Sequence, residues 1–117
     1  TMRRMVSVVP GLAQLRRGVV EYYLLALLSR GERYGFDLVR TLGRAGRGAG
    51  EGTVYPVLTR LARDAYVTTT WQESPSGPPR KYYAITPRGQ DALDRFKAEW
   101  KRFRDAVEEL LETGEMQ

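Results

Sequence analysis

The feature that most constrains this fold is the long segment that follows Pro87. Thr86 can cap a helix beginning at Pro87, because proline suits the first helical position, where an N–H would have no helical acceptor. No proline follows, and no glycine lies between Gly89 and Gly114. The segment therefore predicts one helix of about 26 residues, or about 39 Å at 1.5 Å per residue.

Upstream, the sequence predicts three shorter helices and then two strands. The three helices are expected over residues 18–29, 34–43 and 52–64 from their apolar spacing. In the first of them the tyrosine- and leucine-rich run also suits a buried strand, but its length favours a helix. Residues 67–73 and 80–86 are rich in β-branched and aromatic residues, and residues 74–79 supply proline, serine and glycine for a turn.

Three helices followed by a hairpin is the arrangement of a winged helix-turn-helix domain. The expected fold class is therefore mainly α (α+β), with a two-stranded β-wing and a long C-terminal helix. Residues 1–16 are expected to form an N-terminal arm or a short helix. Residues 17–86 form the winged helix-turn-helix domain, and residues 87–117 the C-terminal dimerisation helix.

An apolar stripe runs along the predicted C-terminal helix at alternating spacings of three and four. Its members are Leu93, Phe96, Trp100, Phe103, Val107 and Leu110. This spacing forms the heptad seam through which two helices pair. The stripe could instead pack wholly on its own domain, but a helix this long extends past what three short helices and a hairpin can cover. We therefore predict a homodimer that uses these six residues.

Charge is distributed unevenly along the chain. Residues 1–86 hold 13 Lys and Arg against six Asp and Glu, whereas residues 87–117 hold six against eight. A basic N-terminal part suits a polyanionic partner such as double-stranded DNA. The same charges could also serve ordinary solubility.

The composition argues against several other functions. Cys and His are absent, so disulfides and zinc sites built on these residues are excluded, and we expect no metal and no cofactor. The longest apolar run, residues 22–28, is shorter than the roughly 18 residues that suggest a membrane span, so we expect no membrane segment and a cytoplasmic location. No paired-carboxylate or nucleophile motif suggests an enzyme.

The third predicted helix is the expected recognition helix, because in this fold it enters the major groove while the wing reaches the backbone or minor groove. Hydroxyl and guanidinium groups can donate hydrogen bonds to bases and phosphates. Three prolines stiffen the wing loop, which limits the entropy lost on docking. Arg60 and Arg63 by themselves would also fit an ordinary solvated face. The candidate DNA contacts are Arg17, Tyr34, Gly52, Thr53, Tyr55, Pro56, Thr59, Arg60, Arg63, Arg80 and Lys81.

Aromatic residues of the apolar stripe also permit a small-molecule site. Phe96 and Trp100 could stack on a planar ligand near a dimer axis. Alternatively, Trp100 packs in the dimer interface and binds no ligand. A two-fold dimer would bind an inverted repeat, with half-sites about 10 to 10.5 base pairs apart or a small multiple of that spacing.

Two motifs resemble the PadR family of bacterial transcriptional regulators. Residues 52–56 read Gly-Thr-Val-Tyr-Pro, and residues 79–83 read Pro-Arg-Lys-Tyr-Tyr, with Thr86 and Gly89 soon after. The resemblance covers residues 17–112, nearly the whole chain. It is closest to the compact members of the family, which have a single C-terminal dimerisation helix.

The resemblance implies a homodimeric repressor that a small molecule or stress signal commonly releases from DNA. It implies DNA contacts at Thr53, Tyr55, Pro56 and the wing residues Arg80 and Lys81. Members that bind planar drugs place a tryptophan where Trp100 stands. A protein-interaction module that has kept the same scaffold remains an alternative, because a fold alone does not set function.

Overall fold

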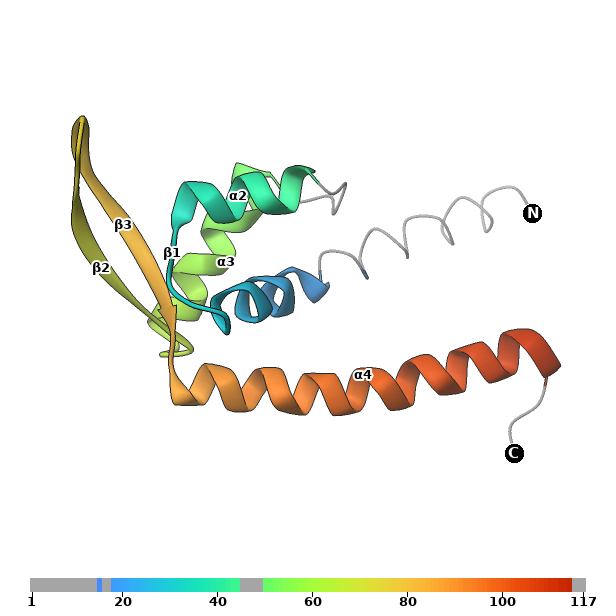
Figure 1. Ribbon diagram of the computed structural model, residues 1–117. Coiled ribbons are helices and arrows are strands. Elements are labelled where there is room, and N and C mark those ends of the chain that lie inside the picture. Colours follow the sequence, from blue (N-terminus) through green and yellow to red (C-terminus); the bar gives the residue numbers. More distant parts are fainter. Residues whose placement is uncertain (1–14, 16–17, 45–49, 115–117) are drawn as a thin grey trace.

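The computed structural model describes residues 15, 18–44 and 50–114 (Figure 1). A first helix spans residues 18–28. The elements that follow are β1 (Arg33–Tyr34), α2 (Gly35–Arg44), α3 (Glu51–Arg63), β2 (Val67–Ser74), β3 (Gly77–Ile85) and α4 (Pro87–Thr113). The three shorter helices lie on one side of α4, and the β2–β3 hairpin projects from the N-terminal end of α4 (Figure 1). The predicted order of three helices, wing and long helix is confirmed.

The core lies where the three shorter helices meet the base of the wing. It consists of Val20, Leu24, Leu25, Leu28, Leu38, Val39, Leu42, Val54, Leu58, Leu61, Val67, Tyr83 and Leu93. The first helix supplies four of these residues, and Tyr22, Tyr23 and Leu27 on its other faces are partly buried against the same core. A helix that is apolar on most faces must be covered from several directions, as this one is.

The sheet has three strands rather than the two expected from the sequence. β3 is central, pairing with β2 on one side and with β1 on the other. Tyr34 therefore belongs to β1, opposite Tyr82, and α2 begins one residue later at Gly35. β1 was not predicted because a strand of two residues is too short to show the alternating pattern of a strand in the sequence. It forms because β3 has an edge with which these residues can pair.

The wing is longer than predicted, and its loop is shorter. β3 begins at Gly77, which pairs with Ser74, so that Pro78 and Pro79 lie within a strand and not in a loop. Two features make proline tolerable there. The ladder has a register shift between Gln72 and Ser74, and β1 leaves the outer edge of β3 unpaired next to the prolines.

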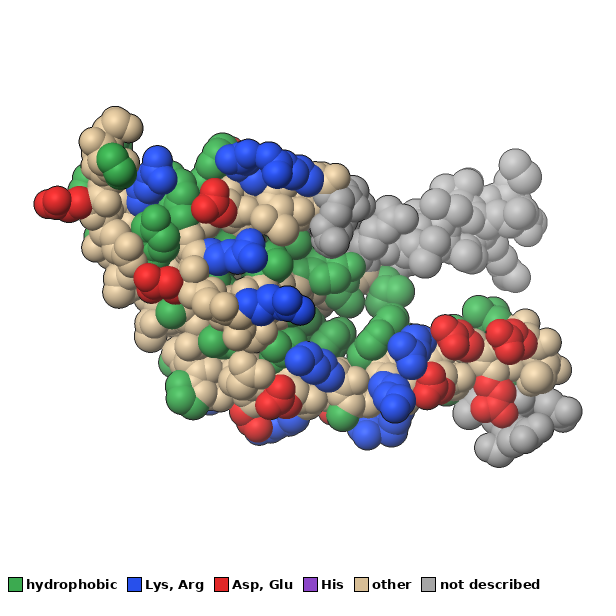
Figure 2. Space-filling model, viewed as in Figure 1, with side chains coloured by type: hydrophobic (Ala, Val, Ile, Leu, Met, Phe, Trp, Pro, Cys, Tyr) green, Lys and Arg blue, Asp and Glu red, His purple; other side chains and the backbone are tan. Residues whose placement is uncertain are grey.

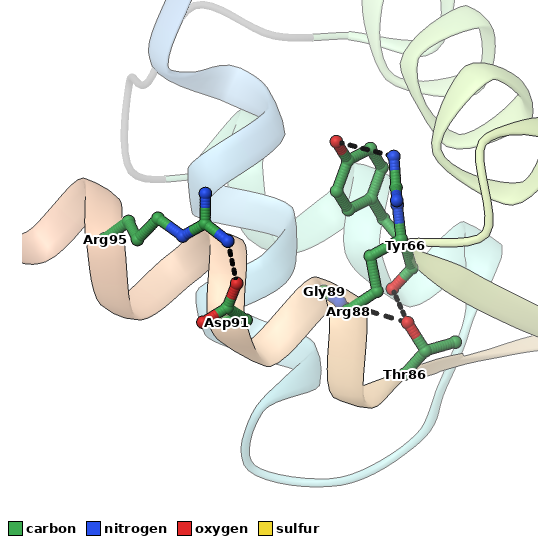
Figure 3. A network of polar contacts seen from close by, with 6 residues as sticks. All are labelled: Tyr66, Thr86, Arg88, Gly89, Asp91 and Arg95. Atoms are coloured by element: carbon green, nitrogen blue, oxygen red, sulfur yellow. Dashed lines mark hydrogen bonds and ion pairs between the residues drawn. The ribbon is translucent and has the colours of Figure 1, made fainter.

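α4 begins as the sequence predicts. The Thr86 hydroxyl accepts a hydrogen bond from the Gly89 backbone N–H at 3.0 Å and lies 3.0 Å from the carbonyl oxygen of Tyr66 (Figure 3). Gly114 ends the helix in a left-handed conformation, with φ of 78°. These caps satisfy backbone groups that helix ends leave without partners.

Two kinds of feature are absent from the described residues. No described helix combines the length and the apolar character needed to cross a membrane. Within the same residues, His, Cys, Asp and Glu form no group of three or more that could hold a metal ion.

Candidate nucleic-acid interface

The exposed side of α3 carries most of the candidate contacts. Val54, Leu58 and Leu61 are buried and fix which side of the helix faces the core. A helix turns 100° per residue, so the candidates lie on the sides of α3 that face away from these three residues. Thr53 is half-buried there. The exposed candidates are Gly52, Tyr55, Pro56, Thr59, Arg60 and Arg63.

Tyr55 lies where α3 begins, against the start of α2. A Cβ atom added to Gly35 would lie 3.1 Å from a ring carbon of Tyr83 and 3.4 Å from a ring carbon of Tyr55, so both rings border that glycine. Burial, followed by the Glu51 carboxylate, raises the pKa of the Tyr55 hydroxyl above its usual value. The hydroxyl therefore keeps its proton at neutral pH and can donate a hydrogen bond to a base or a phosphate.

The two arginines of α3 both have carboxylate partners. Arg60 Nη2 donates to Glu21 Oε2 at 2.5 Å, which ties α3 to the first helix. Arg63 Nε donates to Asp64 Oδ1 at 3.3 Å, and the Arg63 side chain is 69% exposed. Arg63 therefore lies open to solvent, whereas Arg60 turns toward the first helix.

Arg80 and Lys81 lie in β3, where successive side chains point to opposite faces of the wing. The Arg80 guanidinium lies 4.9 Å from the centre of the Tyr34 ring, which brings these two candidates together. The Lys81 Nζ lies 5.8 Å from the Trp71 ring centre and 5.7 Å from that of Tyr83. The sequence predicted both basic residues at the start of a strand, at the edge of the wing loop; because β3 begins at Gly77, they lie further inside the strand.

Three functional candidates were missed from the sequence. Arg40 and Arg44 are exposed on the side of α2 opposite Leu38 and Leu42, and their spacing of four was the signal for a shared helix face. Figure 2 shows basic side chains along α2 and beside the hairpin, in addition to those on α4. The third is Trp71, whose exposed indole has no distinguishing pattern in the sequence.

The candidates fall into two groups. Tyr34, Tyr55, Arg80 and Lys81 gather around the start of α2 and the wing, whereas Arg63 lies about 12 Å further along α3 at 1.5 Å per residue. One further candidate, Arg17, is outside the described residues.

The apolar stripe of α4 divides into an inner and an outer part. Leu93 is only 2% exposed in the core of its own chain, and Phe96 stacks on Tyr22 of the first helix with ring centres 3.9 Å apart. Trp100 is 37% exposed and Phe103 55% exposed. Val107 is half-buried and Leu110 is exposed. The part of the stripe that is open to a partner therefore begins at Trp100.

The two aromatic residues predicted to hold a ligand border open apolar grooves. Phe96 and Trp100 face one groove of about 360 Å³ between the first helix and α4, which Tyr22 and Leu93 also line. Both residues border a second groove of about 430 Å³ together with Phe103. The Phe96 and Trp100 rings are stacked, with their centres 6.3 Å apart.

Comparisons with known proteins agree with this fold. The model of the PadR-like transcriptional regulator family matches residues 24–95, more than half of the chain. A PadR family transcriptional regulator from Eggerthella lenta is 34% identical, with a TM-score of 0.81, and the match covers 97% of this chain and 99% of that one. A PadR-like regulator from Bacillus cereus is 36% identical, with a TM-score of 0.75, over 84% of this chain and 96% of that one. An uncharacterised protein of Lysinibacillus sphaericus is 25% identical over 82% of this chain and 91% of its own length. The chain therefore belongs to the PadR-like family of transcriptional regulators.

Proposed function

We propose that this chain is a homodimeric repressor that binds an inverted-repeat operator in double-stranded DNA. The observation that supports this most is that polar and basic side chains lie on the wing and on the side of α3 that faces away from its buried residues. In this arrangement α3 enters the major groove and presents Thr53 and Tyr55 to base edges. Lys81 and Arg63 neutralise phosphates on either side.

The dimer gives the operator its symmetry. The outer part of the α4 stripe, from Trp100 to Leu110, pairs with the same surface of a second copy. A two-fold axis then holds two α3 helices over two major grooves, and half-sites lie about 10 to 10.5 base pairs apart or a small multiple of that. Such a repressor works in the cytoplasm of a bacterium, where the chromosome is.

A planar small molecule is the proposed signal that releases the repressor. The apolar grooves at Phe96 and Trp100 support this proposal, because two stacked rings offer a flat surface to a ligand. Both grooves border α4 and the first helix. A ligand there would change how two copies sit together, and hence the spacing of their α3 helices.

Fluorescence anisotropy with labelled DNA from upstream of the gene tests the DNA-binding proposal. We expect binding that weakens steeply as salt rises, because neutralised phosphates release their counterions. Lys81→Ala and Arg63→Ala should each weaken binding and reduce the slope of log affinity against log salt by about one. Each substitution removes one basic group that the proposal places on a phosphate.

Arg95→Ala is the matched control for Arg63→Ala. Arg95 is an exposed arginine paired with a nearby carboxylate, that of Asp91, but it lies on α4 (Figure 3). Its removal should leave affinity and salt slope unchanged. Salt-independent binding, or equal losses in all three variants, would contradict the proposed interface. A chain that binds no DNA but captures a stoichiometric protein partner would favour the interaction-module alternative.

A further inference from the structure

We propose that Trp71 is a DNA contact of the wing. Its indole ring would pack on the deoxyribose backbone beside α3, and its ring N–H would donate a hydrogen bond to a phosphate oxygen. The inference rests on the proposed DNA-binding function and adds a residue whose contribution is not electrostatic.

The strand register places Trp71 on the same face of the wing as the recognition helix. Residues directly opposite each other in an antiparallel pair share a face, and Trp71 is paired with Lys81, just as Thr69 is paired with Tyr83. Tyr83 is buried in the core at 5% exposure, and its ring borders Gly35 together with that of Tyr55. Trp71 lies on the same face of the wing as Tyr83, and it is two residues, or about 7 Å, closer to the tip of the hairpin than Thr69, the residue paired with Tyr83.

The exposure of Trp71 makes its indole ring available to a binding partner. The residue is 67% exposed, although an indole ring is among the largest apolar groups a protein can bury. β2 is an edge strand, but it pairs with β3 at Trp71 itself and at Thr70 and Gln72 before and after it, so the ring is presented by a hydrogen-bonded strand. A rigid aromatic side chain loses little conformational entropy when it binds.

The charge beside Trp71 favours DNA over an apolar protein surface. Lys81 Nζ lies 5.8 Å from the indole ring centre. An apolar partner would have to remove water from that ammonium group without neutralising it, which is unfavourable. A DNA backbone alternates apolar sugars with anionic phosphates, so it can satisfy the ring and the ammonium at the same time.

Two readouts on the same titration test the proposal. Labelled DNA reports affinity by anisotropy, and intrinsic tryptophan emission reports contact with the indole. The chain has two tryptophans, so Trp71→Phe leaves Trp100 as the remaining emitter. We expect DNA to change the emission of the wild-type protein and to leave that of Trp71→Phe nearly constant while it still binds. Trp71→Ala should lower affinity about tenfold, which is 1.4 kcal/mol.

The salt dependence separates Trp71 from its basic neighbour. Trp71→Ala removes no charge, so its salt slope should equal that of the wild type, whereas Lys81→Ala should lose about one unit. Thr70→Ala is the control for the opposite face of the wing, because Thr70 is exposed and pairs with Tyr82. It should bind like the wild type.

Each outcome decides the proposal. Wild-type affinity in both Trp71 variants, or an emission change that persists in Trp71→Phe, overturns the contact while leaving the proposed DNA-binding function intact. Absence of any anisotropy change with the wild-type protein overturns both. If Trp71→Ala unfolds in urea more readily than the wild type, the comparison of tryptophan emission between the wild type and Trp71→Phe, which keeps an aromatic ring in the strand, decides instead.

Discussion

Gly89 allows the start of α4 to lie against the backbone of Tyr66. A Cβ atom at this position would lie 2.2 Å from the carbonyl oxygen of Tyr66 and 2.8 Å from Cγ1 of Ile85. The first atom is backbone, so the clash cannot be relieved by a side-chain rotation. The first turn of α4 thus packs directly on the connection between α3 and β2, and only glycine allows this approach.

Replacing Gly89 with alanine should therefore destabilise the protein strongly. We expect Gly89→Ala to lower the free energy of unfolding by about 3 kcal/mol, because the backbone of α4 or of Tyr66 must move. Urea denaturation followed by circular dichroism measures the change. Gly43→Ala is the matched control, since Gly43 is a helical glycine of α2 with nothing within 4 Å of its Cβ position. It should raise stability by up to about 1 kcal/mol, and equal effects at the two sites would contradict the packing argument.

At the scale of elements, the ion pair between Arg60 and Glu21 joins α3 to the first helix. The first helix thus contacts both α3 and α4 at neighbouring positions. Glu21 binds Arg60 of α3, and Tyr22 stacks on Phe96 of α4. The Arg60 side chain is 47% exposed, so the pair contributes less than about 1 kcal/mol to stability. For the proposed function, the more important consequence of the pair is that Glu21 neutralises a positive charge that α3 would otherwise present to DNA.

Removing the Glu21 charge should strengthen DNA binding. Glu21→Gln frees the Arg60 guanidinium to neutralise a phosphate, so we expect a severalfold higher affinity and a salt slope steeper by about one. Anisotropy titrations at several salt concentrations measure both quantities. Asp91→Asn is the control, because it frees Arg95 on α4 with the same change in net charge. A steeper slope in both variants would point to net charge alone, and lower affinity in Glu21→Gln would mean that Glu21 holds Arg60 in its binding orientation.

At the scale of the whole molecule, α4 presents more apolar surface than the described part of the chain covers. Phe103 is 55% exposed, Leu110 46% and Leu111 81%, while the N-terminal part of the same helix is packed on the core through Leu93. An apolar strip of this kind on a 27-residue helix is suited to a second copy of the helix.

Sedimentation velocity tests whether this surface forms the dimer. We expect the wild-type protein to sediment as a dimer at micromolar concentration and Phe103→Asp as a monomer, because two buried carboxylates would face each other across the two-fold axis. The Phe103→Asp variant should also lose binding to a two-half-site operator. Ala98→Asp introduces the same charge at an exposed position on the opposite side of α4 and should remain dimeric. A monomeric wild-type protein would refute the dimer.

The sequence by itself determined the elements whose signals are local. The start of α4 follows from Thr86 and Pro87, and the helices follow from apolar spacing and flanking glycines, because capping and periodicity involve residues within a few positions of each other. The exposed side of α3 followed in the same way, since its buried residues define the remaining faces. These local rules were enough to predict the mainly α fold with its wing, whereas the family was predicted from the resemblance of residues 52–56 and 79–83 to PadR regulators.

Only the tertiary structure decided the features that depend on residues distant in the chain. β1 exists because Arg33 and Tyr34 meet the free edge of β3, almost 50 residues later. Arg60 finds Glu21 39 positions away, and Trp71 is placed beside Lys81 by the register of the wing. Leu93 turns into the core instead of toward a partner, because the first helix covers that end of α4. Such contacts form when whole elements pack together, and no short-range pattern in the sequence encodes them.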